Sequence, residues 1–428
     1  MRSTRNRNGR RRGALAAVML AVAVSTTDGR GAARATGEQV TLTLVALASA
    51  KPGIDEAIAG FEASQDAIEV EATYYEAGDA YTAAVPTQFA GGNGSDIVHV
   101  LSGHASPYST TAFAGAGYLA DLSEEPWVDT MYSATRSLYE YDGAVFARDL
   151  GVAPLAVLSY NRAFFAEHDL SVPETFGELL DVCGAIAETG TIPVAWGGAS
   201  PPVNANNVVT LAARTVLADD PDWLSRRLDN ETTFADTPGW RSALDDFVAM
   251  IDAGCFSQGA GGMSLAEMVS SFAGGQSAMM YTTGMLNGQV LAQTPDLDIG
   301  MFPPPGHTPD TTRVMVQASG GLGIWSGSEH SDEARIFLEF ISDESVSVEL
   351  ASLAQIIAPG PAERGELPGA YEELAPFFTA DTVLPDMTAR WPNTQMNTLT
   401  GQSIQGLFTG QKSVEDVLAD MDTYFEGS

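Results

Sequence analysis

Apolar and polar positions in the first part of the chain follow patterns that predict strands separated by helices. Residues 40–48 (VTLTLVALA) form a β-branched apolar run, and residues 68–75 (IEVEATYY) alternate apolar and polar side chains, so both are predicted strands. Residues 97–101 form a third such run. Strand, helix, strand, helix and strand at this spacing indicate a parallel α/β sheet with right-handed crossovers.

The stretch from residue 141 to residue 180 changes this pattern. An apolar run at residues 151–159 predicts a strand, and Pro173 marks a turn between a short amphipathic segment and a longer predicted helix. Residues 192–196 (IPVAW) predict a further strand. A chain of 428 residues also exceeds the roughly 250 to 300 residues at which one hydrophobic core stops growing. We therefore interpret this stretch as the passage from one lobe into a second.

The first 35 residues predict an export signal. Several arginines precede an apolar run at residues 14–24, and Ala33 and Ala35 are small residues at the positions that signal peptidase reads. This run is shorter than the roughly 20 residues that span a bilayer. A basic disordered arm is the alternative, and Arg11 beside Arg12 leaves both Sec and twin-arginine export open. We therefore expect a mature protein in the periplasm or outside the cell.

The charge balance excludes two classes of partner. The chain has 55 acidic and 21 basic residues and a formal net charge of −34 at pH 7. Many of the arginines lie in the predicted export signal, so its removal would leave a still more acidic protein. A field of this sign repels nucleic acid and anionic lipid. We take solubility to be its main consequence.

The cysteines and histidines suggest limited chemistry. Cys183 and Cys255 both fall near the ends of predicted helices, and two cysteines in an exported protein are often paired. Their spacing alone does not show whether their Cα atoms lie within the roughly 4.4 to 6.8 Å that a disulfide requires. The five histidines show no metal-ligand spacing, so we expect no metal site.

No sequence motif points to catalysis. GxSxG, HExxH and a cysteine–histidine nucleophile pattern are all absent. Residues 91–94 are rich in glycine, but they lack the GK[ST] ending of a phosphate loop and precede a predicted strand. A carboxylate pair for glycoside hydrolysis stays open in so acidic a chain, although nothing singles one out. We expect a binding protein that needs no cofactor, with a secreted glycosidase as the alternative.

Six segments share their order and spacing with one family. They are LTLVALASAKPG at residues 42–53, FAGGNGSDIVHV at 89–100, FAGAGYLADL at 113–122, YDGAVFARDLGVAPLAVLSYNRAFFAEHDLSVPETFGELL at 141–180, FAGGQSAMMYTTG at 272–284 and DEARIFLEFISDESVSVELA at 332–351. These segments resemble those of the extracellular solute-binding proteins of family 1, the maltose-binding-protein-like subunits of ABC importers. The likeness covers nearly all of residues 40–425.

This resemblance implies a two-lobed, type II-like periplasmic-binding-protein fold of the α/β class, in which each lobe is a sheet flanked by helices and hinge crossings join the lobes. After Pro303, a strand pattern at residues 314–317 and a predicted helix at residues 331–342 would return the chain to the first lobe. The expected parts are a signal peptide at 1–35, an N-terminal lobe of residues 36–150 and 303–357, and a C-terminal lobe of residues 151–302 and 358–428.

The chain departs from the family pattern at two places. Met285 stands near a position where relatives commonly have tryptophan, so one sugar-stacking ring is expected to be missing. Many relatives from Gram-positive bacteria begin at a lipid-modified cysteine, whereas no cysteine precedes Cys183 here. Anchoring by that route is therefore not expected.

Scarce basic residues favour a neutral ligand, because phosphates and dicarboxylates usually meet arginine or helix N-termini. Neutral sugars are instead bound by aromatic faces and polar side chains, and ligands of parallel sheets lie beyond the carboxyl ends of the strands. Trp196 could equally pack in the core, and Asn204 could cap a helix. The residues expected at the ligand are Lys51, Ser102, His104, Asp149, Trp196, Asn204, Tyr281, Gly284, Gly320, Trp391, Asn393 and Asn397.

These observations predict an exported, monomeric solute-binding protein. It would capture a mono- or oligosaccharide between its two lobes and pass it to the membrane subunits of an ABC permease. Hinge closure would follow from tighter binding of the ligand to the closed form. A ligand-loaded partner of a sensor or receptor would share all of these features and stays open as an alternative.

Overall fold

The N-terminal part of the computed structural model is built on a sheet with parallel and antiparallel strands. β1 pairs in parallel with β2 and β3, and β13 lies antiparallel to both β3 and β6. The order is therefore β2-β1-β3-β13-β6. Its strands are β1 (Val40–Leu47), β2 (Ile68–Tyr75), β3 (Ile97–Val100), β6 (Arg148–Asp149) and β13 (Gly321–Ile324). This confirms the three predicted parallel strands near the N-terminus.

The structure describes residues 39–76, 79–104, 106–379, 382–393 and 395–427, and residues 39–428 form one unit. The predicted export signal at residues 1–35 lies outside the described residues. Within the described ranges, no helix combines the length and apolar character needed to cross a membrane.

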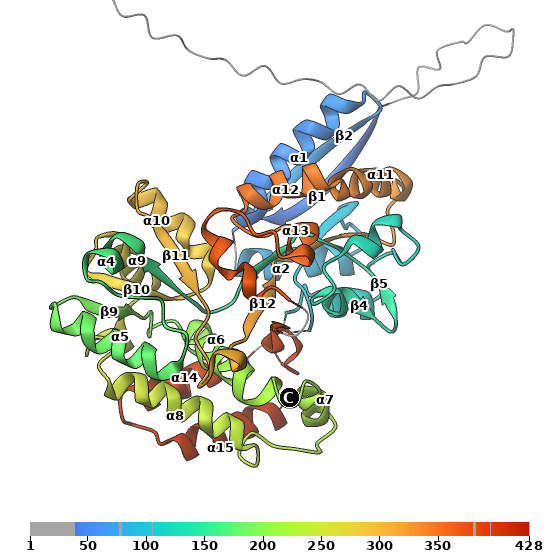
Figure 1. Ribbon diagram of the computed structural model, residues 1–428. Helices are drawn as coiled ribbons and strands as arrows, with labels where there is room; N and C mark the ends of the chain where they lie inside the picture. Colours follow the sequence, from blue (N-terminus) through green and yellow to red (C-terminus); the bar gives the residue numbers. More distant parts are fainter. Residues whose placement is uncertain (1–38, 77–78, 105, 380–381, 394, 428) are drawn as a thin grey trace, which may run out of the picture. The chain divides into compact units, whose positions relative to one another are not determined.

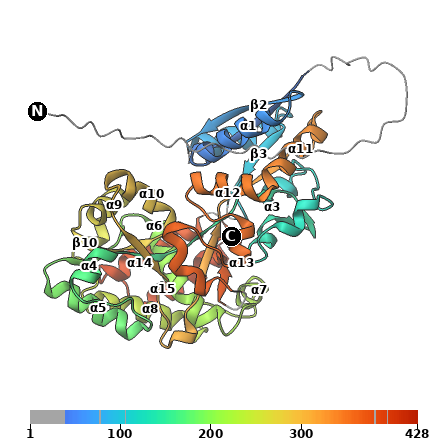
Figure 2. The same ribbon diagram turned by 45° about the horizontal axis from the view of Figure 1, so that its top comes forward.

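Helices from both ends of the sequence cover the first sheet. Ile54, Ala57 and Phe61 of α1 are buried, as their helical spacing requires. The Phe61 ring packs edge-on against Phe337 of α11, with ring centroids 5.2 Å apart. Figures 1 and 2 both show α1 beside β2. The helices of this part are α1 (Lys51–Ser64), α2 (Asp79–Ala90), α3 (Thr110–Gly115), α11 (Ser331–Ser342) and α12 (Glu344–Leu353).

A second sheet has the order β11-β8-β10-β9, in which β8 runs antiparallel to both β10 and β11. Its strands are β8 (Val157–Asn161), β9 (Ile192–Ala195), β10 (Ser277–Thr282) and β11 (Ile299–Phe302). Its core also contains side chains from near the C-terminus, including Ile404 and Met421. The helices packed around it are α4 (Arg162–Glu167), α5 (Phe176–Glu188), α6 (Pro201–Ala212), α7 (Trp223–Leu228), α8 (Pro238–Asp252), α9 (Leu265–Ala273), α10 (Asn287–Gln293), α14 (Met396–Phe408) and α15 (Val414–Glu426).

A small third sheet takes its strands from three separate parts of the sequence. It has the order β14-β12-β7, with β7 (Val152–Pro154), β12 (Val314–Ala318) and β14 (Val383–Pro385). Ile357, just before α13 (Pro359–Arg364), forms an antiparallel bridge with Val152. A separate apolar cluster, with Val316, Ile357 and Leu374 among its members, packs on this sheet. Short strands β4 (Glu140–Tyr141) and β5 (Ala144–Val145) form a hairpin elsewhere.

The apolar run at residues 151–159 is two strands and not the single strand expected. β7 belongs to the third sheet and β8 to the second. Ala156 between them adopts a left-handed backbone conformation with φ 47°, and this redirects the chain. The turn marked by Pro173 leads into α5 through a capping box. In this box Thr175 accepts from the Glu178 N–H, and Glu178 accepts from the Thr175 N–H.

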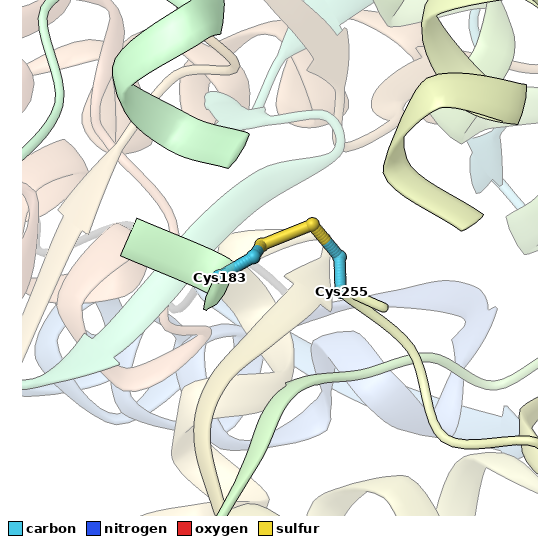
Figure 3. Close-up of a disulfide and its surroundings, with 2 residues drawn as sticks. All are labelled: Cys183 and Cys255. Carbon is cyan, nitrogen blue, oxygen red and sulfur yellow. A yellow bond between two sulfur atoms is a disulfide. The ribbon is translucent and has the colours of Figure 1, made fainter. Parts of the chain in front are cut away.

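A disulfide joins α5 to the segment after α8 (Figure 3). The Cα atoms of Cys183 and Cys255 are 4.9 Å apart, within the range that the bond requires. Both residues are fully buried in the core around the second sheet. Because 72 residues separate them along the chain, the bond closes a long loop and constrains the unfolded chain strongly.

Candidate functional site

A cavity of about 420 Å³ lies at the carboxyl ends of β1 and β3. In its wall, Leu47 ends β1 and Ser49 follows it, and Leu101, Ser102 and Ser106 follow β3. Strands of an α/β sheet direct ligands to this edge, because the connecting loops there can carry polar side chains without disturbing the core. The cavity therefore lies where the sequence predicts a ligand site.

The facing wall comes from much later in the sequence. Pro202 lies at the start of α6, and Asn397 and Thr398 lie in the first turn of α14. These two helices pack closely, since a Cβ placed on Gly401 of α14 would lie 1.8 Å from the Pro201 carbonyl oxygen of α6. Glycine at position 401 thus allows both helix starts to reach the same cavity.

His99 is a wall residue although it lies inside β3. Its side chain is buried, and neither ring nitrogen makes a hydrogen bond of normal geometry. Burial lowers the pKa of His99 to about 4, although the nearby Ser319 main chain acts in the opposite direction. The imidazole is therefore neutral at pH 7, with one nitrogen able to donate a hydrogen bond and the other able to accept one.

Asp386 contributes a carboxylate to the cavity wall. Its Oδ1 accepts a hydrogen bond from the Thr388 N–H (2.8 Å), and its Oδ2 accepts one from the Thr388 hydroxyl (2.9 Å). Burial raises the pKa of Asp386 to about 6, in spite of these two hydrogen bonds. The described residues of the wall include no lysine or arginine that would neutralise this carboxylate.

The end of β12 supplies the remaining polar wall. Gln317 donates from Nε2 to the Thr283 hydroxyl (3.3 Å) and lies 3.2 Å from the Met285 sulfur. Met285, Gln317, Ala318 and Ser319 all line the cavity. The thioether of Met285 thus lies at the candidate site, near the position where relatives commonly have tryptophan.

Six of the twelve residues expected at the ligand line the cavity or neighbour its wall, and Lys51 does not line it. Ser102, Asn393 and Asn397 line it. Gly284 and Gly320 are the chain neighbours of the wall residues Met285 and Ser319. The others are more peripheral. The exposed His104 donates from its backbone N–H to the Ala389 carbonyl (2.7 Å), and Lys51 pairs with Asp55 (2.6 Å) beside the Tyr74 ring.

The other five expected residues have buried side chains and do not line this cavity. Trp196 is fully buried, donates from Nε1 to the Asn207 side-chain oxygen (3.1 Å) and stacks near Phe408. The structure differs here from the expected sugar contact, because the end of β9 directs the indole into the core. The side chain of Asn204 instead donates to the carbonyls of Gly198 and Gly401.

Tyr281, Trp391 and Asp149 have similarly internal positions. The Tyr281 hydroxyl donates to the Asn207 carbonyl (2.9 Å), and Trp391 is a fully buried member of the core around the second sheet. Asp149 forms a buried ion pair with Arg148 and accepts a hydrogen bond from the Tyr132 N–H. These side chains therefore lie in the interior and not in the cavity wall.

Several wall residues were not expected from the sequence, among them His99, Ser319 and Asp386. His99 lies within a predicted strand, and its only distinctive feature in the sequence is that it is polar within an apolar run (IVHV). Ser319 and Asp386 lie in short connections without a recognisable pattern. A buried polar residue one or two positions before a strand end is the one signal that could have identified His99.

Comparison with known proteins gives a consistent result. Residues 46–346 match the family model described as bacterial extracellular solute-binding protein. None of the curated proteins compared with the chain matches it. Among solved structures, a family 1 extracellular solute-binding protein from Bifidobacterium longum subsp. infantis is similar, with 19% identity and a TM-score of 0.74 over 92% of this chain and 100% of that one.

Two further solved structures are similar over nearly their whole length. RafE from Streptococcus pneumoniae in its apo form has 18% identity and a TM-score of 0.74, over 92% of this chain and 99% of that one. A sugar transporter protein from Bacillus licheniformis in complex with stachyose has 18% identity and a TM-score of 0.67, over 90% and 98%. At such identities these similarities establish a common fold, that of two-lobed solute-binding proteins.

Proposed function

Because the chain belongs to the bacterial extracellular solute-binding proteins, we propose that it captures a small neutral carbohydrate and delivers it to the membrane subunits of an ABC permease. The chemistry of the cavity wall is the observation that carries this proposal. Hydroxyls, amides, one neutral imidazole and the Asp386 carboxylate lie in the wall among apolar side chains, and the described wall residues include no lysine or arginine. Such groups suit the hydroxyls of a sugar better than a phosphate or a carboxylate.

The lobes would consist of residues 36–150 with 303–357 and of residues 151–302 with 358–428. The sheet assignments support this division, since β13 joins the first sheet while α14 and α15 pack in the core around the second. The third sheet and the Val152–Ile357 bridge would then act as the hinge. Ligand would favour the closed form only to the extent that it binds that form more tightly.

The cavity argues for binding without catalysis. Glycoside hydrolysis generally uses two carboxyl groups that flank the scissile bond. The described wall contains one, Asp386. We therefore infer that the protein binds and releases its ligand unchanged. We also propose that it acts as a monomer.

Export of the chain agrees with this role. Residues 1–35 carry the features of a signal peptide, and the Cys183–Cys255 disulfide suits an oxidising compartment. We propose a location in the periplasm or outside the cell.

Thermal unfolding with a panel of mono- and oligosaccharides tests the proposal. A ligand present at 100 times its dissociation constant should add about 2.7 kcal/mol to the free energy of unfolding, because it binds the folded state alone. Amino acids and polyamines serve as controls and should leave the midpoint unchanged. A shift by these controls and by no saccharide would contradict carbohydrate binding. Release of chromophore from a chromogenic glycoside would contradict the absence of catalysis.

A further inference from the structure

Unpaired polar atoms from three distant segments meet at the cavity. Both ring nitrogens of His99, the hydroxyl of Ser319 and the Oδ1 of Asn397 are buried and lack a hydrogen bond of normal geometry, although the His99 ring also faces the Ser319 main chain. All three residues line the same cavity, and they come from β3, the end of β12 and the first turn of α14. Most buried polar atoms of proteins are paired, so such a convergence indicates groups reserved for a ligand.

In the described chain, no other residue with an unpaired buried side-chain atom lines this cavity. The Nε1 atoms of Trp127, Trp240 and Trp391 and the hydroxyl of Thr135, for example, belong to residues that do not line this cavity. The distinguishing feature at His99, Ser319 and Asn397 is therefore a common space that a ligand can enter.

The cavity lacks a platform for stacking a sugar ring. Among the described residues of its wall there is no phenylalanine, tyrosine or tryptophan, and the thioether of Met285 is exposed to it instead. Trp196, Tyr281 and Trp391 are all enclosed in the core. Chains of sugar units need extended contact with such faces, whereas one compact ring can be held by hydrogen bonds alone.

The size of the cavity also favours a compact ligand. Ligand sites usually enclose roughly 300 to 1,000 Å³, and the volume of about 420 Å³ found here lies in the lower part of that range. A compact ligand would fill this space and could satisfy the unpaired atoms together.

Backbone geometry fixes the position of His99. β3 is paired with β1 on one side and β13 on the other, and the His99 carbonyl accepts a hydrogen bond from the Tyr81 hydroxyl (2.5 Å). Gly320 provides the space for the ring, because a Cβ there would lie 2.3 Å from the imidazole Nε2. The imidazole is therefore held at the cavity by its surroundings.

We propose that this cavity selects a monosaccharide-sized, neutral polyhydroxyl ligand through hydrogen bonds from His99, Ser319 and Asn397, and that His99 is its main specificity residue. This inference rests on the proposed function and specifies the ligand of the same site. A neutral imidazole offers one donor and one acceptor, and hydroxyl groups can complement both. Longer sugar chains would leave these buried atoms unsatisfied or meet no aromatic face.

Calorimetric titration with matched monosaccharides and linear oligosaccharides of three or more units tests the inference. We expect the tightest binding from a monosaccharide or a sugar alcohol. His99→Phe keeps a planar ring but removes both nitrogens, and it should weaken that binding about tenfold or more. His168→Phe makes the same exchange at an exposed position on the C-terminal side of α4, and should leave the dissociation constant unchanged.

Ser319→Ala provides a second measurement that needs little repacking, and it should weaken binding about threefold to tenfold. Oligosaccharides that bind tenfold more tightly than monosaccharides, or affinities unaffected by both His99→Phe and Ser319→Ala, would overturn the inference while leaving sugar capture intact. Binding of sugar alcohols alone, with loss in His99→Phe, would support a compact ligand and overturn the saccharide assignment. Absence of binding by every polyhydroxyl compound would overturn both.

Discussion

Single residues set the electrostatic character of the cavity. Asp386 is buried, and its pKa is raised to about 6 because burial disfavours the charged carboxylate. His99 is buried too, and its pKa falls to about 4 because burial disfavours the charged imidazolium. Between pH 7 and 8 the wall therefore holds one buried carboxylate and one neutral imidazole.

The raised pKa of Asp386 gives a testable pH dependence. Between pH 4 and 6 the folded protein binds the Asp386 proton more tightly than the unfolded chain does, so this residue lowers stability as the pH rises through that window. Relative to Asp386→Asn, the wild type should lose up to roughly 3 kcal/mol of unfolding free energy between pH 4 and 7. Urea titrations of both proteins across this range measure the difference.

A second variant separates Asp386 from other titrating groups. The Thr388 hydroxyl donates to Asp386 and lowers its pKa, so Thr388→Val should move the window to higher pH. Parallel stability curves for the wild type and Asp386→Asn would contradict a raised pKa.

At the scale of elements, periodicity predicted most strands and helices but could not show where sheets divide. β1, β2 and β3 follow from alternation and apolar runs, and α11 occupies the predicted residues 331–342. β7 and β8 were read as one strand, because a conformational break at Ala156 has no compositional signal. Periodicity identifies a buried face without showing which element covers it.

The same limit applies to the candidate site. Ser102 was expected because it follows a strand, and Asn393 because its loop resembles one that commonly contributes ligand contacts in the family; both line the cavity. Trp196 was expected at the ligand for its position at a strand end, yet its side chain packs against Phe247 and Phe408. Which way a terminal side chain turns depends on helices that arrive much later in the sequence.

Gly151, just before β7, gives a prediction for the third sheet. Its φ is +135°, and a Cβ there would lie 2.4 Å from the Ile357 carbonyl oxygen. Gly151→Ala should therefore lower the free energy of unfolding by more than about 1 kcal/mol, through backbone strain and the clash with Ile357. Chemical denaturation measures this loss.

Gly143→Ala is the matched control. Gly143 also has a positive φ, +81°, but a Cβ there would meet nothing within 4 Å. Gly143→Ala should show the cost of backbone strain alone. Equal losses of unfolding free energy in the two variants would therefore show that the clash with Ile357 is unimportant.

At the scale of the whole molecule, the net charge of −34 at pH 7 is the dominant electrostatic property. Like charges repel one another most in the compact state, and salt screens this repulsion. The ion pairs on the surface contribute little each, so their screening should not offset the gain.

The thermal midpoint at pH 7.5 should therefore rise between 10 and about 150 mM salt, as the screening length falls from roughly 30 to 8 Å. The same salt change near the isoelectric point of about 4.2 provides the control and should have little effect. A midpoint that falls with salt at pH 7.5 would show that attractive ion pairs outweigh the repulsion.

The position of β13 between β3 and β6 has a consequence for biosynthesis. β3 ends at Val100, but its antiparallel neighbour begins only at Gly321, and the second sheet likewise awaits α14 and α15. A nascent chain that ends before residue 321 would therefore present β3 as an unprotected edge, open to pairing with other chains. Neither core can close until most of the polypeptide has been made, so a truncated product is expected to aggregate and not to persist as a folded half.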